Sequence, residues 1–161
     1  MKHIKASIND HQDSFPIAII VSQFNQDLTS SLLKGTVHRL LDRGILKEDV
    51  LVIEVPGAVE IPFLAQRVAL QKQHHVIIAL GAVIRGETSH YDSVCQLVSE
   101  GCQRVSLSFN IPVIFGVLTT ENDAQAWDRL GGRHGHKGAD AADCAIAMHE
   151  TLKQLSGGKH D

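Results

Sequence analysis

Residues 76–92 read VIIALGAVIRGETSHYD and contain two different structural patterns. The first nine residues, Val76–Ile84, carry no charge and are rich in Val and Ile, which is typical of a strand buried on both faces of a parallel sheet. Charged and turn-forming residues follow at 85–89. Apolar residues then recur at steps of three and four, as on the buried side of a helix: Tyr91, Val94, Cys95, Val98, Cys102 and Val105. The stretch therefore predicts a strand, a tight glycine turn and the start of a helix.

This turn is suited to binding an anion. The first amides of a helix lack internal partners and point outward at the positive end of the helix dipole. Gly86 lets an oxygen approach the backbone, Thr88 and Ser89 offer hydroxyl groups, and His90 can exchange a proton near neutral pH. An anion site beside a proton-transfer group is a catalytic arrangement. The alternative is that Thr88 or Ser89 only caps the helix and His90 is an ordinary surface residue.

The composition indicates one soluble globular domain. The chain has 161 residues, 43% hydrophobic and 20% charged, and its net charge of −3 gives no indication of a nucleic-acid partner or an acidic membrane surface. Residues 1–14 lack the hydrophobic core of a signal peptide, and no apolar run is long enough to span a bilayer. Three cysteines without a close pair favour reduced thiols and a cytoplasmic location, with Cys95 and Cys102 in the core.

Ten histidines raise the question of a metal site. The densest groups are His74-His75 and His134-Gly135-His136. Zinc sites usually need three or four convergent ligands, with cysteines or carboxylates among them. Neither group supplies such a set locally, so the sequence predicts no metal.

The rest of the chain repeats the alternation of strand and helix. Predicted strands are 15–21, 50–55, 76–84 and 112–118. The first predicted helix is capped by Asn25 or Asp27 and runs to about Arg43. The other predicted helices open near Ala58, follow Ser89, extend from 119 to 130, and span 139–155. This pattern predicts an α/β, three-layer, flavodoxin-like fold: a parallel four-stranded sheet with helices on both faces. We expect residues 1–14 to form an arm, 15–161 to form a single domain, and 131–138 to form a loop.

In such a sheet the carboxyl ends of the strands share one edge, where ligands bind. The predicted strand ends bring together 24–25, 57–60, 83–90 and 115–120. Phe24 offers a flat face for a heteroaromatic ring, and Glu60 can accept hydrogen bonds from hydroxyls. The simpler alternatives are that Phe24 packs in the core and that Glu60 only complements the dipole of its helix.

Several motifs in sequence order carry a family resemblance. They are Phe24-Asn25, VPGAVEIP from Val55, GAVIRGETSHYD from Gly81, PVIFGVLTTEN from Pro112, and Arg129 with Lys137-Gly138. Together they resemble the lumazine synthases, transferases of the penultimate step of riboflavin biosynthesis. The resemblance implies condensation of 5-amino-6-ribitylamino-2,4-pyrimidinedione with 3,4-dihydroxy-2-butanone 4-phosphate to 6,7-dimethyl-8-ribityllumazine, with release of phosphate and water. It implies no cofactor and no metal.

The resemblance also assigns roles to individual residues. It makes His90 the catalytic proton-transfer residue. The residues implied for the pyrimidine and its ribityl chain are Phe24, Asn25, Gly57, Ala58, Val59, Glu60, Ala82, Val83, Ile84, Phe115 and Lys137. Those implied for the phosphate are Gly86, Glu87, Thr88 and Arg129.

An oligomer follows from the same resemblance. In the family the site lies between subunits of a pentamer, and the N-terminal segment, here near 4–8, pairs with a neighbouring sheet. The resemblance leaves open a decamer, a shell of sixty subunits and an association with riboflavin synthase. Two departures bear on the assembly and the loop: His136 stands where many members have Asn, and Leu130 where many have Ala.

Three other functions compete with this interpretation. A flavodoxin-like binding module for flavin would share the sheet, but the first strand–helix turn, SQFNQD, lacks a dense Ser/Thr/Gly phosphate loop. A phospho-acceptor receiver domain needs acidic residues at the ends of strands one and three, and neither SQFN nor AVIRG has one. A structural shell protein with a decayed site would not need His90, Arg129 and Lys137.

Overall fold

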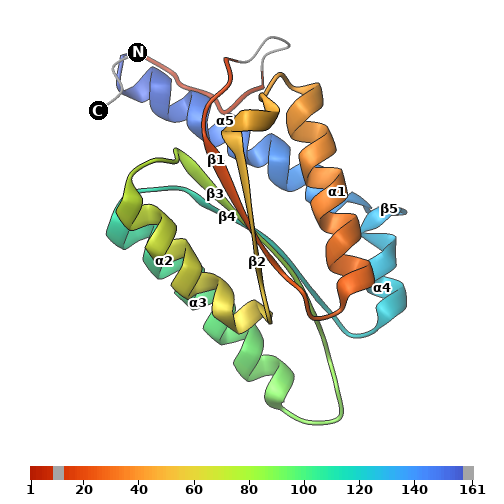
Figure 1. The fold of residues 1–161 in the computed structure, drawn as a ribbon. Helices are drawn as coiled ribbons and strands as arrows, with labels where there is room; N and C mark the ends of the chain where they lie inside the picture. Colours follow the sequence, from red (N-terminus) through yellow and green to blue (C-terminus); the bar gives the residue numbers. More distant parts are fainter. Residues whose placement is uncertain (9–12, 158–161) are drawn as a thin grey trace.

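The computed structural model describes residues 1–8 and 13–157, which contain a four-stranded parallel sheet (Figure 1). The strands are β1 (Ile17–Ser22), β2 (Val50–Val55), β3 (Val76–Ile84) and β4 (Val113–Thr120), in the spatial order β2-β1-β3-β4. All three pairings are parallel, so the four carboxyl ends lie at one edge of the sheet. The predicted fold class is therefore confirmed.

Helices cover both faces of this sheet (Figure 1). One face packs against α1 (Gln26–Asp42), α4 (Asp123–Asp128) and α5 (Lys137–Leu155), and the other against α2 (Ile61–Gln71) and α3 (His90–Phe109). Alternate residues of β1 point to opposite layers: Ile17 and Ile19 belong to the first core, and Ala18 and Ile20 to the second. This explains why the central strands are apolar without a break.

The edge strands are more exposed. In β2, Leu51 and Val52 are each 39% exposed, whereas every residue of β1 is buried. An edge strand presents unpaired backbone groups that another chain can meet. Of the predicted N-terminal arm, residues 9–12 lie outside the described residues, and Ile8 packs against the first core of its own chain.

Predictions for the second half of the chain were partly wrong. Thr119 and Thr120 extend β4 rather than opening a helix, and the short helix α4 begins after Asn122, whose side chain accepts a hydrogen bond from the Gln125 amide at 2.9 Å. The predicted loop 131–138 contains most of an antiparallel hairpin of β5 (Leu130–Gly132) and β6 (Gly135–His136), and α5 starts two residues early.

The short elements and the thiols complete the fold. Short 3-10 turns, η1 (Lys47–Asp49) and η2 (Ala58–Glu60), precede β2 and α2. All three cysteines are free; Cys102 is buried as predicted, whereas Cys95 is only half-buried.

Within the described ranges, no helix is long and apolar enough to cross a membrane, and no group of three His, Cys, Asp or Glu side chains could hold a metal ion.

Candidate active site

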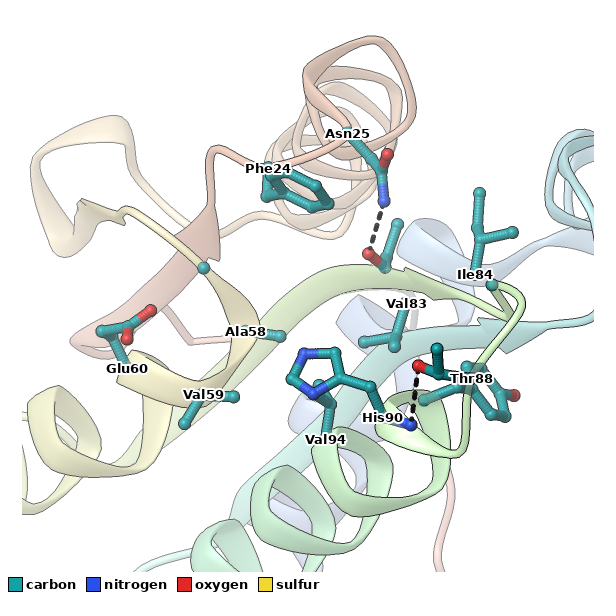
Figure 2. A pocket seen from close by; sticks show the side chains of 14 residues that line it. Phe24, Asn25, Ala58, Val59, Glu60, Val83, Ile84, Thr88, His90 and Val94 are labelled. Atoms are coloured by element: carbon teal, nitrogen blue, oxygen red, sulfur yellow. Dashed lines mark hydrogen bonds between the residues drawn. The ribbon is translucent and has the colours of Figure 1, made fainter.

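A cavity of about 360 Å³ lies where the carboxyl ends of β1 and β3 meet the start of α3 (Figure 2). Its walls come from three separate parts of the chain, 24–25, 57–60 and 82–94, which the parallel sheet brings to one edge. The lining residues are Phe24, Asn25, Gly57, Ala58, Val59, Glu60, Ala82, Val83, Ile84, Gly86, Thr88, His90, Tyr91 and Val94. Twelve of these fourteen were predicted from the sequence as site residues.

Phe24 forms an aromatic wall of the cavity, and backbone hydrogen bonds fix its position. Its amide donates to the Pro56 carbonyl at 3.1 Å, and the amide of Gln23 donates to the Val55 carbonyl at 2.7 Å. These bonds tie the turn after β1 to the end of β2. The Phe24 side chain remains 70% exposed, so it is not a core residue. An apolar ring fixed at a cavity mouth can stack on a flat heterocycle.

Asn25 links this turn to β3. Its backbone is left-handed, with φ of 59°, which asparagine tolerates better than most residues. Its side-chain amide donates to the Ala82 carbonyl at 2.9 Å, as Figure 2 shows. Asn25 therefore does not cap α1 through its side chain, as one of the predicted options required. It fixes the distance between the aromatic wall and the floor made by β3.

The segment after β2 supplies the second wall. Ala58 is buried, whereas Val59 and Glu60 are exposed. A Cβ atom on Gly57 would lie 2.9 Å from Oε2 of Glu60, which places the carboxylate close over this glycine. Glu60 thus presents acceptor oxygens at the end of the cavity near Phe24 and Ala58 (Figure 2).

The turn between β3 and α3 is open to solvent. A Cβ atom built on Gly86 would meet no atom within 4 Å, so a ligand oxygen has room to approach the backbone. Ser89 occupies the N-cap position of α3 without a capping bond from its side chain. The Thr88 hydroxyl instead accepts a hydrogen bond from the His90 amide at 3.3 Å. Thr88 therefore does bond a helix amide, as the capping alternative supposed, and it also lines the cavity.

His90 stands at the first position of α3 and is exposed. Its ring points into the cavity, among Ala58, Val83 and Val94 (Figure 2). Phe24 and His90 thus face the same space from two sides. A heteroaromatic ring stacked on Phe24 and an anion at the Gly86 turn would have an imidazole between them for proton transfer.

Two cavity residues, Tyr91 and Val94, were not predicted as site residues. Both belong to the apolar pattern of α3, which was interpreted as core packing. Both are only half-buried, because the first turn of α3 extends past the sheet to the cavity. Burial raises the pKa of the Tyr91 phenol, so this side chain is a neutral hydrogen-bonding group near neutral pH. Their position at the start of the helix, beside a polar turn, was the signal available in the sequence.

Four predicted site residues lie outside this cavity. Glu87 is exposed on the turn but is not among the lining residues. Phe115 and Lys137 line a second pocket of about 440 Å³, between β4, α3 and α5. Arg129 lies with Lys137 in a third pocket of about 300 Å³, beside the end of β4. The Arg129 guanidinium donates to the Gln125 carbonyl at 2.8 Å, which holds it against α4.

Comparison with known proteins identifies the family. Residues 14–153 match the family model described as 6,7-dimethyl-8-ribityllumazine synthase. Proteins of that name from Coxiella burnetii, strains CbuG_Q212 and RSA 493 / Nine Mile phase I, are each 51% identical over 144 residues, covering 89% of this chain and 95% of the relative. A third relative of the same name, from strain Dugway 5J108-111, shows the same identity and coverage. The chain belongs to the 6,7-dimethyl-8-ribityllumazine synthase family.

Proposed function

We propose that this chain condenses 5-amino-6-ribitylamino-2,4-pyrimidinedione with 3,4-dihydroxy-2-butanone 4-phosphate in the cavity between Phe24 and His90. Family membership supports the reaction. The observation that carries the site assignment is that one cavity is lined by an exposed aromatic ring, an imidazole and an open glycine turn. These groups match a heterocycle, a proton transfer and a phosphate.

Each substrate has its own part of the cavity. The pyrimidine ring stacks on Phe24 and rests against Val83 and Ile84. Its ribityl hydroxyls bond to Asn25 and Glu60, beside Ala58 and Val59. The phosphate of the second substrate binds at Gly86–Thr88, where the outward-facing amides of a helix N-terminus favour an anion.

The reaction proceeds through an imine. The primary amine of the pyrimidine attacks the ketone carbon, and the carbonyl oxygen leaves as water. Phosphate then departs, and the ring closes with loss of a second water. His90 accepts and returns protons at these steps. Such a general acid–base residue typically contributes about 10²–10⁴-fold to the rate.

Positioning supplies the larger part of the acceleration. Both substrates already carry reactive groups, so holding them together removes most of the entropic barrier. Orientation is worth about 7–11 kcal/mol in well-aligned systems. The rigid links from Phe24 to Pro56 and from Asn25 to Ala82 serve this purpose, because they fix the cavity walls before the substrates arrive.

A neighbouring subunit completes the site. Phe115, Arg129 and Lys137 lie along the outer side of β4, an open edge of the sheet, and so cannot line the cavity of their own chain. In a pentamer the β4 side of one subunit faces the cavity of the next, where Arg129 supplies the cation for the phosphate. We further propose that in the assembly residues 4–8 leave their own chain, against whose core Ile8 packs here, and pair with the open edge of β2 in a neighbour. We place this assembly in the cytoplasm, in keeping with its three free thiols.

The direct test is to mix the purified protein with both substrates and follow the fluorescence of the lumazine. Multiple turnovers with release of one phosphate per lumazine support the proposed function. Tight binding of a flavin without turnover would instead favour a binding module with the same fold.

A further inference from the structure

Arg85 contacts three side chains on three sides of its guanidinium group. Its Nε donates to Glu121 at 2.7 Å, and its Nη2 and Nη1 donate to the two carboxylate oxygens of Asp92 at 3.2 and 3.4 Å. Its guanidinium carbon lies 4.4 Å from the centre of the Tyr91 ring. The side chain thus uses both its planar fork and its flat face, which lysine cannot do.

These contacts join the two ends of the proposed phosphate turn. Arg85 immediately precedes Gly86, and Tyr91 and Asp92 immediately follow His90. The Arg85 amide also donates to the Thr120 carbonyl at 2.9 Å, which fixes the start of the turn to β4. Residues 85–90 are all exposed, and Gly86 has open space around it. The turn therefore receives little support from packing, and Arg85 connects its two ends.

Arg85 itself does not line the cavity, whereas Gly86, Thr88, His90 and Tyr91 do. The guanidinium is also engaged by two carboxylates, which raise the pKa of Arg85 through their hydrogen bonds and charges. A substrate phosphate would have to compete with both of them. An effect of Arg85 on the reaction therefore acts through the groups that it holds.

We propose that Arg85 is a positioning residue that holds the 86–89 turn and His90 in place for catalysis, an inference that rests on the function proposed above. The ion pairs with Asp92 and Glu121 set the direction in which α3 leaves the turn. The Tyr91 ring contacts the guanidinium and also lines the cavity, so the same contact keeps one wall of the cavity fixed.

The test is a kinetic double-mutant cycle on the full-length protein, with Arg85→Ala, Asp92→Asn and the double variant. We expect Arg85→Ala to lower kcat by about 10- to 100-fold, because a misplaced reacting group is costly. Asp92→Asn should also lower kcat. The double variant should be no slower than Arg85→Ala, because both substitutions remove the same ion pair between Arg85 and Asp92. Arg85→Lys should restore little of the loss.

Controls separate this role from a general structural one. Arg104→Ala, at an exposed position towards the C-terminal end of α3, should leave kcat unchanged. Thermal midpoint and light-scattering mass are measured for every variant, and Asp92→Asn, which preserves side-chain shape, carries the test if Arg85→Ala does not fold.

Two results would overturn the inference. Wild-type kinetics in Arg85→Ala would show that the turn does not need this side chain. Full recovery in Arg85→Lys, with a lower KM for the phosphate substrate in Asp92→Asn, would make Arg85 an electrostatic partner of the substrate. If the wild-type protein formed no lumazine, the proposed function itself would be wrong. If the wild-type protein were active and Arg85→Ala equally active, only the inference about Arg85 would be wrong.

Discussion

The His90 side chain owes its position to its place on α3. It is the first residue of the helix, its amide bonds to Thr88, and its ring is free to face the cavity. The helix fixes the backbone of His90, while its exposed side chain extends into the cavity. This combination suits a group that must reach several atoms of a reacting substrate in turn.

Replacing His90 with Ala should slow the reaction without abolishing it. Loss of a general acid–base residue costs about 10²–10⁴-fold, whereas the contribution of substrate orientation remains. The measurement is steady-state kcat for lumazine formation over a range of pH. A variant with the kcat and pH profile of the wild type would remove His90 from the mechanism.

At the level of single residues, the sequence predicted most of the cavity residues but placed two of them in the core. Phe24, Glu60 and His90 stood out because an aromatic ring, a carboxylate and an imidazole followed predicted strand ends. Tyr91 and Val94 were interpreted as core because their spacing fits a helix face. Periodicity shows which side of a helix is apolar, but it does not show where that side leaves the sheet and meets a cavity.

At the scale of elements, α5 depends on close contact with α1. The His136 ring accepts hydrogen bonds from the amides of Gly138 and Ala139 at 3.1 and 3.3 Å and so caps α5. The Thr36 hydroxyl of α1 lies 3.0 Å from the Gly138 carbonyl. A Cβ atom on Gly138 would lie 2.3 Å from the backbone carbonyl of Leu32, so only glycine fits between the two helices.

Gly138→Ala should therefore destabilise the protein, and Gly86→Ala should not. The methyl group at 138 meets backbone that cannot move aside, and overpacking of this kind typically costs about 1–3 kcal/mol. The methyl group at 86 meets open space. It should leave the free energy of unfolding unchanged and raise KM for the phosphate substrate. Urea denaturation and kinetics on both variants measure these effects, and equal stability of the two would contradict the packing argument.

The hairpin before α5 shows a limit of sequence patterns at this scale. β5 and β6 comprise three and two residues, most of them glycine or exposed, so they carry no alternation of apolar and polar residues. The long strands, by contrast, were predicted within two residues at each end, because each is a run of mainly apolar residues, and the two central strands, β1 and β3, are largely buried on both faces. Short strands held by local hydrogen bonds leave no such pattern.

For the molecule as a whole, burial of His74 makes stability depend on pH. Burial lowers the pKa of His74 below its ordinary value of 6.5, and its Nδ1 has no hydrogen-bond partner among the described residues. As the pH falls below about 6.5, the unfolded chain binds this proton more readily than the folded chain. The contribution of neutral His74 is thus fully present above that pH and is lost as the pH decreases towards the folded-state pKa.

The free energy of unfolding should therefore decrease less on acidification in His74→Gln than in the wild type. Urea denaturation at about pH 8 and about pH 5.5 measures the difference, with His3→Gln as the control at an exposed position. A decrease of the same size in wild type and His74→Gln would mean that His74 does not contribute.

In the proposed assembly, two neighbouring subunits are needed to complete each active site. The cavity of one chain holds His90, whereas Arg129 lies on the far side of β4. If each site combines the cavity of one subunit with the β4 side of the next, His90→Ala and Arg129→Ala damage opposite halves of a site. Hybrid assemblies of the two variants then contain sites in which both halves are intact. With random mixing in equal amounts, roughly a quarter of the sites regain both groups.

Co-expression of the two variants with different affinity tags, followed by purification through both tags, yields the hybrids. Their lumazine synthesis per subunit should rise to roughly a quarter of the wild-type rate, above that of either variant alone. A matched control pairs His90→Ala with the double variant His90→Ala/Arg129→Ala, in which no site regains the imidazole and no gain is expected. If hybrids of the two single variants performed no better than the mean of their parents, Arg129 would not serve a neighbouring site, and the shared-site assembly proposed for this chain would be wrong.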